Sequence, residues 1–67
     1  MIEVSVNGET RRVDNGATVA KLLDEMNLTG KRLAVERNGD IVPKSAHGAT
    51  ALLAGDKLEI VVAVGGG

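Results

Sequence analysis

Residues 57–64 restrict the fold of this 67-residue chain more than any other segment. Every second position there carries a large aliphatic side chain: Leu58, Ile60, Val62 and Val64. A period of two places all four side chains on one face of an extended strand. A strand with so apolar a face needs a second layer of structure against it, which the rest of the chain has to supply.

A second alternating segment opens the chain. Its aliphatic residues are Ile2, Val4 and Val6. Asn7-Gly8 follows, a dipeptide that suits the positive φ angles of a tight hairpin turn. Residues 9–14 then return as a polar edge strand, in which two arginines discourage further pairing. We expect the first and last strands, the most apolar pair, to lie side by side in the middle of the sheet.

One helix is predicted after the first hairpin. The hydroxyl group of Thr18 can cap its first turn by accepting a hydrogen bond from a backbone N–H. The aliphatic positions that follow have the spacing i, i+3, i+4 and i+7: Val19, Leu22, Leu23 and Met26. This spacing puts them on one stripe of a helix, so the helix can cover the apolar face of the sheet.

Two shorter strands are predicted next. Residues 33–37 alternate, and Asn38-Gly39 is a second hairpin signal. Residues 41–42 form a short strand that Pro43 ends or confines to a sheet edge.

Residues 44–53 have mixed character, with room for one helical turn before the final strand. The predicted fold class is therefore α+β, with one main helix covering one face of a mixed sheet of four to five strands. We expect residues 1–64 to form one domain and residues 65–67 to form a flexible glycine tail.

Composition excludes several classes of function. The chain has no cysteine and no aromatic residue, so disulfides, thiolate metal sites and a cysteine nucleophile are absent. Its net charge is −1 with no basic block, which argues against nucleic-acid binding. No apolar run is long enough to span a bilayer, and the first residues do not resemble a signal peptide. We expect a cytoplasmic protein that does not bind membranes.

The one histidine, His47, does not indicate catalysis or metal binding. It lies two residues from Ser45, but nothing in this short loop specifies the third group that a nucleophile–base pair needs. The acidic residues are scattered at no metal-ligand spacing, so no metal site is predicted. We expect His47 to have a surface or turn-stabilising role and Lys44 to be a solvated lysine.

The three glycines at the end of the sequence are the candidate functional segment. Three extended residues reach about 10 Å and, without side chains, can enter a channel too narrow for other residues. The α-carboxylate of Gly67 is ionised at neutral pH and can attack the α-phosphate of ATP in a partner enzyme. A sulfur donor can then displace AMP from the acyl-adenylate. The simpler alternative is a frayed end or a cloning remnant.

The outward face of the last strand is a candidate partner surface. Its residues are Lys57, Glu59, Val61 and Ala63, so polarity falls toward the glycines. We expect Val61 and Ala63 to contact a partner, although single exposed aliphatic residues are also common on protein surfaces.

Several segments resemble, in the same order, those of the ThiS family of sulfur carriers. They are Asn7-Gly8, residues 16–19 with Leu22-Leu23, residues 38–44, and the closing residues 56–67. The resemblance covers essentially the whole chain, including its length. It implies a ubiquitin-like β-grasp fold and a role in making the thiazole ring of thiamine.

The resemblance also implies a mechanism in which this chain is not an enzyme. A ThiF-type adenylyltransferase, which uses ATP, would activate Gly67, and a cysteine desulfurase route would supply the sulfur. The resulting thiocarboxylate would donate sulfur to a ThiG-type thiazole synthase, while Gly65 and Gly66 thread the tail into each partner. No bound cofactor is expected. Two features depart from the family pattern: the third glycine, Gly65, and the charged pair Glu36-Arg37.

Three alternatives stay open. The chain could serve another β-grasp sulfur carrier pathway, such as molybdopterin synthesis or tRNA thiolation. It could be a ubiquitin-like modifier that is joined to lysines. It could also be a plain interaction domain in which the glycine tail has no role.

Overall fold

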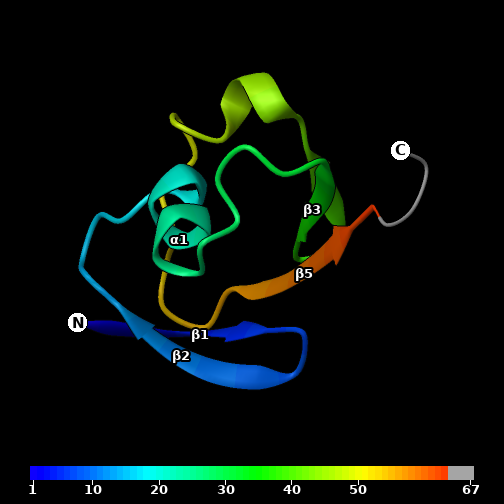
Figure 1. Ribbon diagram of the computed structural model, residues 1–67. Helices are drawn as coiled ribbons and strands as arrows, with labels where there is room; N and C mark the ends of the chain where they lie inside the picture. The colour runs from blue at the N-terminus through cyan, green and yellow to red at the C-terminus, as the bar shows by residue number, and fades with distance from the viewer. Residues whose placement is uncertain (64–67) are drawn as a thin grey trace.

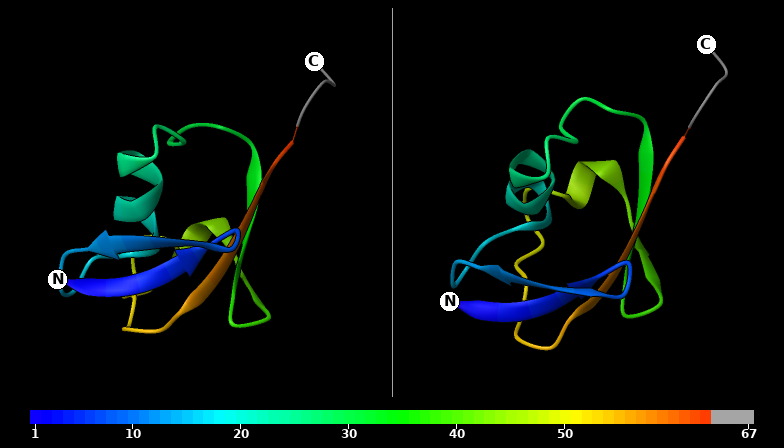
Figure 2. Two further views of the ribbon diagram at one scale, coloured as in Figure 1. Left: turned by 90° about the horizontal axis from the view of Figure 1, so that it is seen from below. Right: turned by 60° about the horizontal axis from the view of Figure 1, so that its bottom comes forward.

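The computed structural model describes residues 1–63, which form one five-stranded sheet and one helix (Figure 1). The elements in chain order are β1 (Ile2–Val6), β2 (Glu9–Val13), α1 (Val19–Glu25), β3 (Leu33–Arg37), β4 (Asp40–Val42), the 3₁₀ turn η1 (Lys44–Ala46) and β5 (Lys57–Val62). Helix α1 packs on one side of the sheet, and no described element covers the other side (Figures 1 and 2). The predicted two-layer α+β architecture is confirmed. The predicted tail, residues 65–67, lies outside the described residues and stays a prediction.

The sheet is mixed, with strand order β2-β1-β5-β3-β4. Strands β1 and β5 pair in parallel, with Val6 opposite Leu58, and the other three pairs are antiparallel. The first and last strands are therefore neighbours, and β5 is the middle strand, as the apolar patterning predicts. The polar strand β2 lies at one edge, and β4, which ends directly before Pro43, lies at the other.

Both predicted Asn-Gly hairpin turns are present. Asn7 and Gly8 have φ angles of 50° and 85°, and Asn38 and Gly39 have φ angles of 52° and 88°. Two consecutive positive φ angles characterise the turn type that matches the twist of the flanking strands.

Helix α1 begins as predicted, with the Lys21 N–H donating to Thr18 Oγ1 at 3.2 Å. Val19, Leu22 and Leu23 are buried against the sheet. Met26, the last residue of the predicted stripe, is only half-buried and follows the end of the helix. Asn27, with φ of 59°, reverses the chain there. A helix of seven residues is too short to be stable alone, so its packing on the sheet holds it in place.

The core is entirely aliphatic. Its buried members are Val4, Val6, Val13, Ala17, Val19, Leu22, Leu23, Val35, Val42, Leu52, Leu58 and Ile60. They come from the inner faces of all five strands, from the helix, from Ala17 in the loop before the helix, and from the crossover before β5. Leu58 and Ile60, predicted from alternation to face inward, are both confirmed as core residues.

The crossover between β4 and β5 contains η1, the single helical turn that the sequence allowed. Thr50 Oγ1 donates to the Ala46 carbonyl at 2.8 Å, and the Leu52 N–H donates to the Ala17 carbonyl at 2.8 Å. His47 Nε2 lies 3.2 Å from the Val42 carbonyl oxygen, in agreement with the predicted turn-stabilising role. These bonds place the Leu52 side chain in the core.

No helix within residues 1–63 has the length and apolarity needed to cross a membrane. Among the same residues, no group of three histidine or acidic side chains is placed so that it could hold a metal ion.

Candidate partner-binding face

The outward face of β5 is open to solvent. Val61 is 67% exposed, and Lys57, Glu59 and Ala63 are exposed as well. The alternation seen in the sequence therefore separates a buried face from an exposed one. Val61 and Ala63, the predicted partner-surface residues, are two positions apart on this exposed face.

Neighbouring strands enlarge the apolar area around Val61. Ala34 on β3 lies directly opposite Val61, and both side chains are exposed. Ile41 on β4, which is 65% exposed, lies opposite Glu36 and therefore diagonal to Ala34. We call Ala34, Ile41, Val61 and Ala63 the sheet patch. These adjoining exposed aliphatic side chains make the sheet patch the candidate interaction surface of this face.

Ala34 and Ile41 were missed as site residues in the sequence. The available signal was the alternation of Ile41 with Val42, which is buried on the helix side. Because β4 is only three residues long, this alternation does not show which of the two residues faces the core.

Two glutamates border the sheet patch. Glu36 on β3 lies directly opposite Glu59 on β5. Residues directly opposite in an antiparallel pair project from the same face, and like charges in this position are destabilising. The pair thus adds negative charge to the sheet patch and would gain from a cationic partner group. The position of Glu36 on the exposed face explains why this residue of the unexpected Glu36-Arg37 pair is charged.

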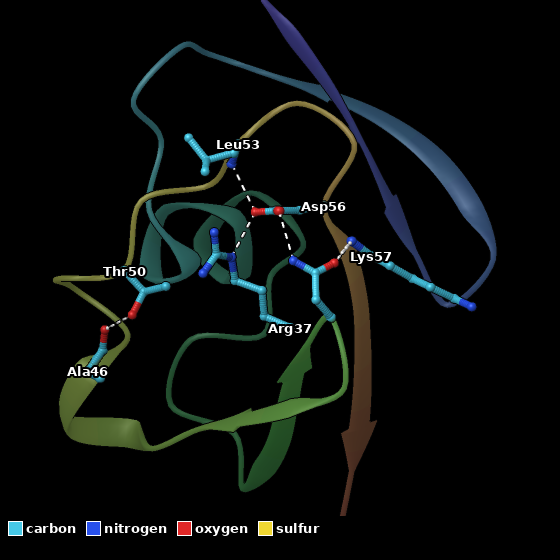
Figure 3. Close-up of polar contacts among 7 residues, drawn as sticks. Arg37, Ala46, Thr50, Leu53, Asp56 and Lys57 are labelled. Atoms are coloured by element: carbon cyan, nitrogen blue, oxygen red, sulfur yellow. Dashed lines mark hydrogen bonds and ion pairs between the residues drawn. The ribbon is translucent and has the colours of Figure 1, made fainter.

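Arg37, the second residue of that pair, is charged because it belongs to a polar network at the start of β5 (Figure 3). Its Nε donates to Asp56 Oδ2 at 2.8 Å, and the Leu53 N–H donates to the same oxygen at 2.9 Å. Asn38 Nδ2 donates to Asp56 Oδ1 at 3.0 Å, while Asn38 Oδ1 accepts from the Lys57 N–H at 2.9 Å. This network ties the β3–β4 hairpin to the first residue of β5.

The Asp56 carboxylate is only 5% exposed, which makes it the buried charged group of the described residues. Burial by itself raises the pKa of Asp56. The hydrogen bonds from Arg37, Leu53 and Asn38 outweigh burial, so the pKa of Asp56 lies below its ordinary value. The carboxylate is therefore ionised at neutral pH and can hold its three donors.

Asn7 forms a second set of polar contacts, farther along β5. The Asn7 N–H donates to the Leu58 carbonyl at 2.9 Å. The Asn7 side chain then bonds to Ile60 twice: Oδ1 accepts from the Ile60 N–H at 2.8 Å, and Nδ2 donates to the Ile60 carbonyl at 3.1 Å. The side chain thereby continues the β1–β5 pairing at the point where β1 turns away.

Beyond Ile60, the chain is bonded to β3 and to Arg32, the residue just before it. Ala34 pairs with Val61, Leu33 pairs with Val62, and the Ala63 N–H donates to the Arg32 carbonyl at 2.9 Å. The strand is thus held in place up to the last described residue. The predicted carrier residue Gly67 and the predicted threading residues Gly65 and Gly66 follow in sequence, outside the described residues.

The sequence profile of the ThiS family matches residues 4–67, almost the entire chain. The chain belongs to the ThiS family. Carriers of this family are not catalysts, which agrees with the prediction that the chain is not an enzyme.

A solved structure supports the same assignment. The crystal structure of the thiamine biosynthesis protein ThiS from Geobacter metallireducens superposes with a TM-score of 0.82 at 30% identity, covering 98% of this chain and 100% of that one. The β-grasp fold implied by the sequence resemblance is therefore confirmed.

Two curated relatives differ in how much of their length matches. The thiazole synthase of Paramagnetospirillum magneticum is 46% identical over 66 residues, which are 98% of this chain but 20% of that protein. This chain thus spans about a fifth of that relative. The protein ycf40 of Pyropia yezoensis is 33% identical over 66 residues, and the match covers 93% of its length.

Proposed function

We propose that this ThiS-family protein carries sulfur as a thiocarboxylate on Gly67 and donates it to a thiazole synthase in thiamine biosynthesis. The observation that carries the proposal is the match of nearly the whole chain to part of a thiazole synthase. When a carrier domain and its acceptor enzyme are parts of one polypeptide, the covalent link keeps them at a high effective concentration. Where they are separate chains, a docking surface has to bring them together.

The chemistry needs little from the folded body. A carboxylate oxygen of Gly67 attacks the α-phosphorus of ATP, pyrophosphate leaves, and an acyl-adenylate forms. A hydrosulfide equivalent then attacks the carbonyl carbon and AMP leaves, so the terminal C–O⁻ becomes C–S⁻. The ATP site belongs to a ThiF-type adenylyltransferase. A cysteine desulfurase supplies the sulfur as a persulfide, and a thiol reductant releases it as hydrosulfide while a disulfide forms. The carrier itself binds no cofactor in this scheme and works in the cytoplasm.

The sheet patch gives the carrier its affinity for these partners. Ile41 and Val61 offer apolar area that a partner can bury, and Glu36 with Glu59 would pair with partner lysines or arginines. Because the glycines follow β5 in sequence, a partner docked on the sheet patch lies beside the strand after which the tail begins. Gly65 and Gly66 supply reach without side chains.

Deletion of Gly66 and Gly67 tests the proposal in a cell that lacks its own carrier. The full-length chain should restore growth without thiamine, and the shortened chain, present at the same level, should not. Growth supported by the shortened chain would contradict the proposal. Immunoblots of the same cells separate the carrier from a protein modifier, because a modifier would give covalent conjugates of higher mass.

A further inference from the structure

A groove on the helix side of the molecule lies between two segments that are distant in sequence. One wall is the loop that joins α1 to β3, residues 28–33, and the other is η1 with the residues just after it, up to Gly48. Ala20 and Leu23 of α1 contribute to the lining, and the groove has a volume of about 500 Å³. It is on the opposite side of the sheet from the sheet patch, so the two surfaces can be occupied at the same time.

The groove combines an apolar interior with a basic rim. Leu23, Leu28 and Leu33 supply aliphatic surface, and Leu28 and Leu33 are only partly buried. The charged side chains that line it are Lys31, Arg32 and Lys44. All three are exposed, and none has an ion pair or side-chain hydrogen bond among the described residues.

The basic rim contrasts with the rest of the chain. The molecule has eight lysines and arginines against nine acidic residues, yet three of the eight line this groove and no acidic residue does. Three exposed cationic side chains thus gather along one groove of a chain with net charge −1, and an acidic group, the Asp24 carboxylate, lies 3.5 Å from Thr29 Oγ1 in the lining. Such a surface attracts negatively charged partners and fixes their orientation.

The shape favours an extended segment of protein over a small molecule. Two separate chain segments form its walls, and the side chains of Lys31, Arg32 and Lys44 along them are exposed to solvent. Pockets for small ligands bury most of the ligand surface, whereas a peptide can bury alternate side chains and leave the others in water. Lysines on both walls, Lys31 on one and Lys44 on the other, can meet carboxylates on either side of such a segment.

We propose that this groove docks an acidic peptide segment of a partner protein, with leucine-like side chains in the apolar interior and carboxylates on Lys31, Arg32 and Lys44. The position of the groove supports this role. The carbonyl of Arg32 accepts the N–H of Ala63, so one wall adjoins the point where β5 leads toward the glycines. A partner held there lies next to Ala63 while the sheet patch is free for another contact.

The test uses the full chain, labelled with ¹⁵N, and a short capped peptide of alternating glutamate and leucine as the probe. Backbone amide shifts should change at Ala20, at residues 28–33 and at Gly48. The double variant K31Q/K44Q should bind about three- to tenfold more weakly, since each exposed charge contributes modestly. The matched variant K21Q/K57Q removes two exposed lysines outside the groove and should bind as the wild type does.

Several results would overturn the proposal. Equal weakening in both double variants would show that only the overall charge matters. Equal affinity for a glutamine–leucine peptide would show that the basic rim does not contribute to binding. If inorganic phosphate produced the same shifts, the groove would bind a small anion. If dilution of the free protein produced them, it would bind a second copy. If removal of residues 64–67 produced them, it would bind the chain's own end. Thiocarboxylate formation on Gly67 is measured separately, so failure here leaves the carrier function standing.

Discussion

The two ends of β5 are built in different ways. Asp56, directly before the strand, accepts three hydrogen bonds, and Asn7 binds both backbone groups of Ile60, the fourth strand residue. At its end, the bonds come from β3 and from Arg32 just before it, and Val61 is 67% exposed on the uncovered face. The strand is fixed by polar side chains at one end and presents apolar surface at the other.

This difference separates stability from function along a single strand. Substitutions at the start of β5 should lower the free energy of unfolding, because buried groups there lose their partners. Substitutions of the exposed residues at its end should leave the fold intact and weaken partner binding, because most of the Val61 surface is in solvent.

The largest effect is expected for Asp56→Ala. This change leaves Arg37 Nε, Asn38 Nδ2 and the Leu53 N–H without their acceptor, and it should destabilise the domain by about 2–4 kcal/mol. Urea unfolding followed by circular dichroism measures the change. Asp40→Ala is the matched control, since Asp40 is exposed at the start of β4 and should change the stability little. Equal effects of the two substitutions would contradict the role of the network.

Val61→Asp should act on binding instead. It places a charge in the sheet patch beside Ala34, and near Glu36 and Glu59, so affinity for the ThiF-type activating enzyme should fall at least about tenfold. The unfolding midpoint should fall less than it does for Asp56→Ala, because Val61 is exposed. Isothermal titration calorimetry with the activating enzyme measures the affinity.

Leu53→Asp provides the control for that experiment. Leu53 is 61% exposed but lies in the turn before β5 rather than on the sheet patch. It should bind the enzyme as the wild type does. If both aspartate variants lost affinity equally, the apolar surface would not be specific to the sheet patch.

Asn7→Gly should have a smaller effect on stability. Glycine keeps the positive φ angle of this position but removes both side-chain hydrogen bonds to Ile60, with an expected loss of about 1 kcal/mol. Asn27→Gly is the matched control, because Asn27 also has a positive φ angle and makes no side-chain hydrogen bond among the described residues. Denaturant midpoints of the two variants should differ. Identical midpoints would show that the Asn7 side-chain hydrogen bonds to Ile60 do not stabilise the fold.

The smallest effect is a dependence of stability on pH. The pKa of Asp56 is lower in the folded chain than in the unfolded chain, where an aspartate has a pKa of about 3.9. The stabilisation is therefore complete above that value and is lost as the pH falls through the lower, folded pKa. The stability difference between the wild type and Asp56→Asn should be constant near neutral pH and should shrink below about pH 4. A difference that stayed constant into acid would show that the Asp56 pKa is not lowered.

The local structure was predictable from the sequence because its causes are local. Asn-Gly pairs specify both hairpins, Thr18 caps the helix, and alternation separates the two faces of β5. These signals depend on residues a few positions apart. The helix end was less well predicted, since Met26 fits the stripe but follows Glu25, the last helical residue.

The contacts that hold β5 were not predicted because they join distant residues. Arg37 and Asp56 are separated by 19 positions, and Asn7 and Ile60 by 53. A periodic pattern shows which face of a strand is buried, but it does not identify the polar partner on another strand. Asn7 illustrates this limit: its turn was predicted from the Asn-Gly pair, while its bonds to Ile60 depend on the parallel pairing of β1 with β5. The basic groove likewise forms only when loop 28–33 and η1 meet over α1.

Intact mass spectrometry with fragmentation of the C-terminal peptide tests the central claim most directly. After incubation with the activating enzyme, ATP and a sulfur donor, the mass of the chain should rise by the difference between one sulfur and one oxygen atom, and the fragments should place that increase on Gly67. An unchanged mass, or an increase located on any residue within 1–63, would contradict the account.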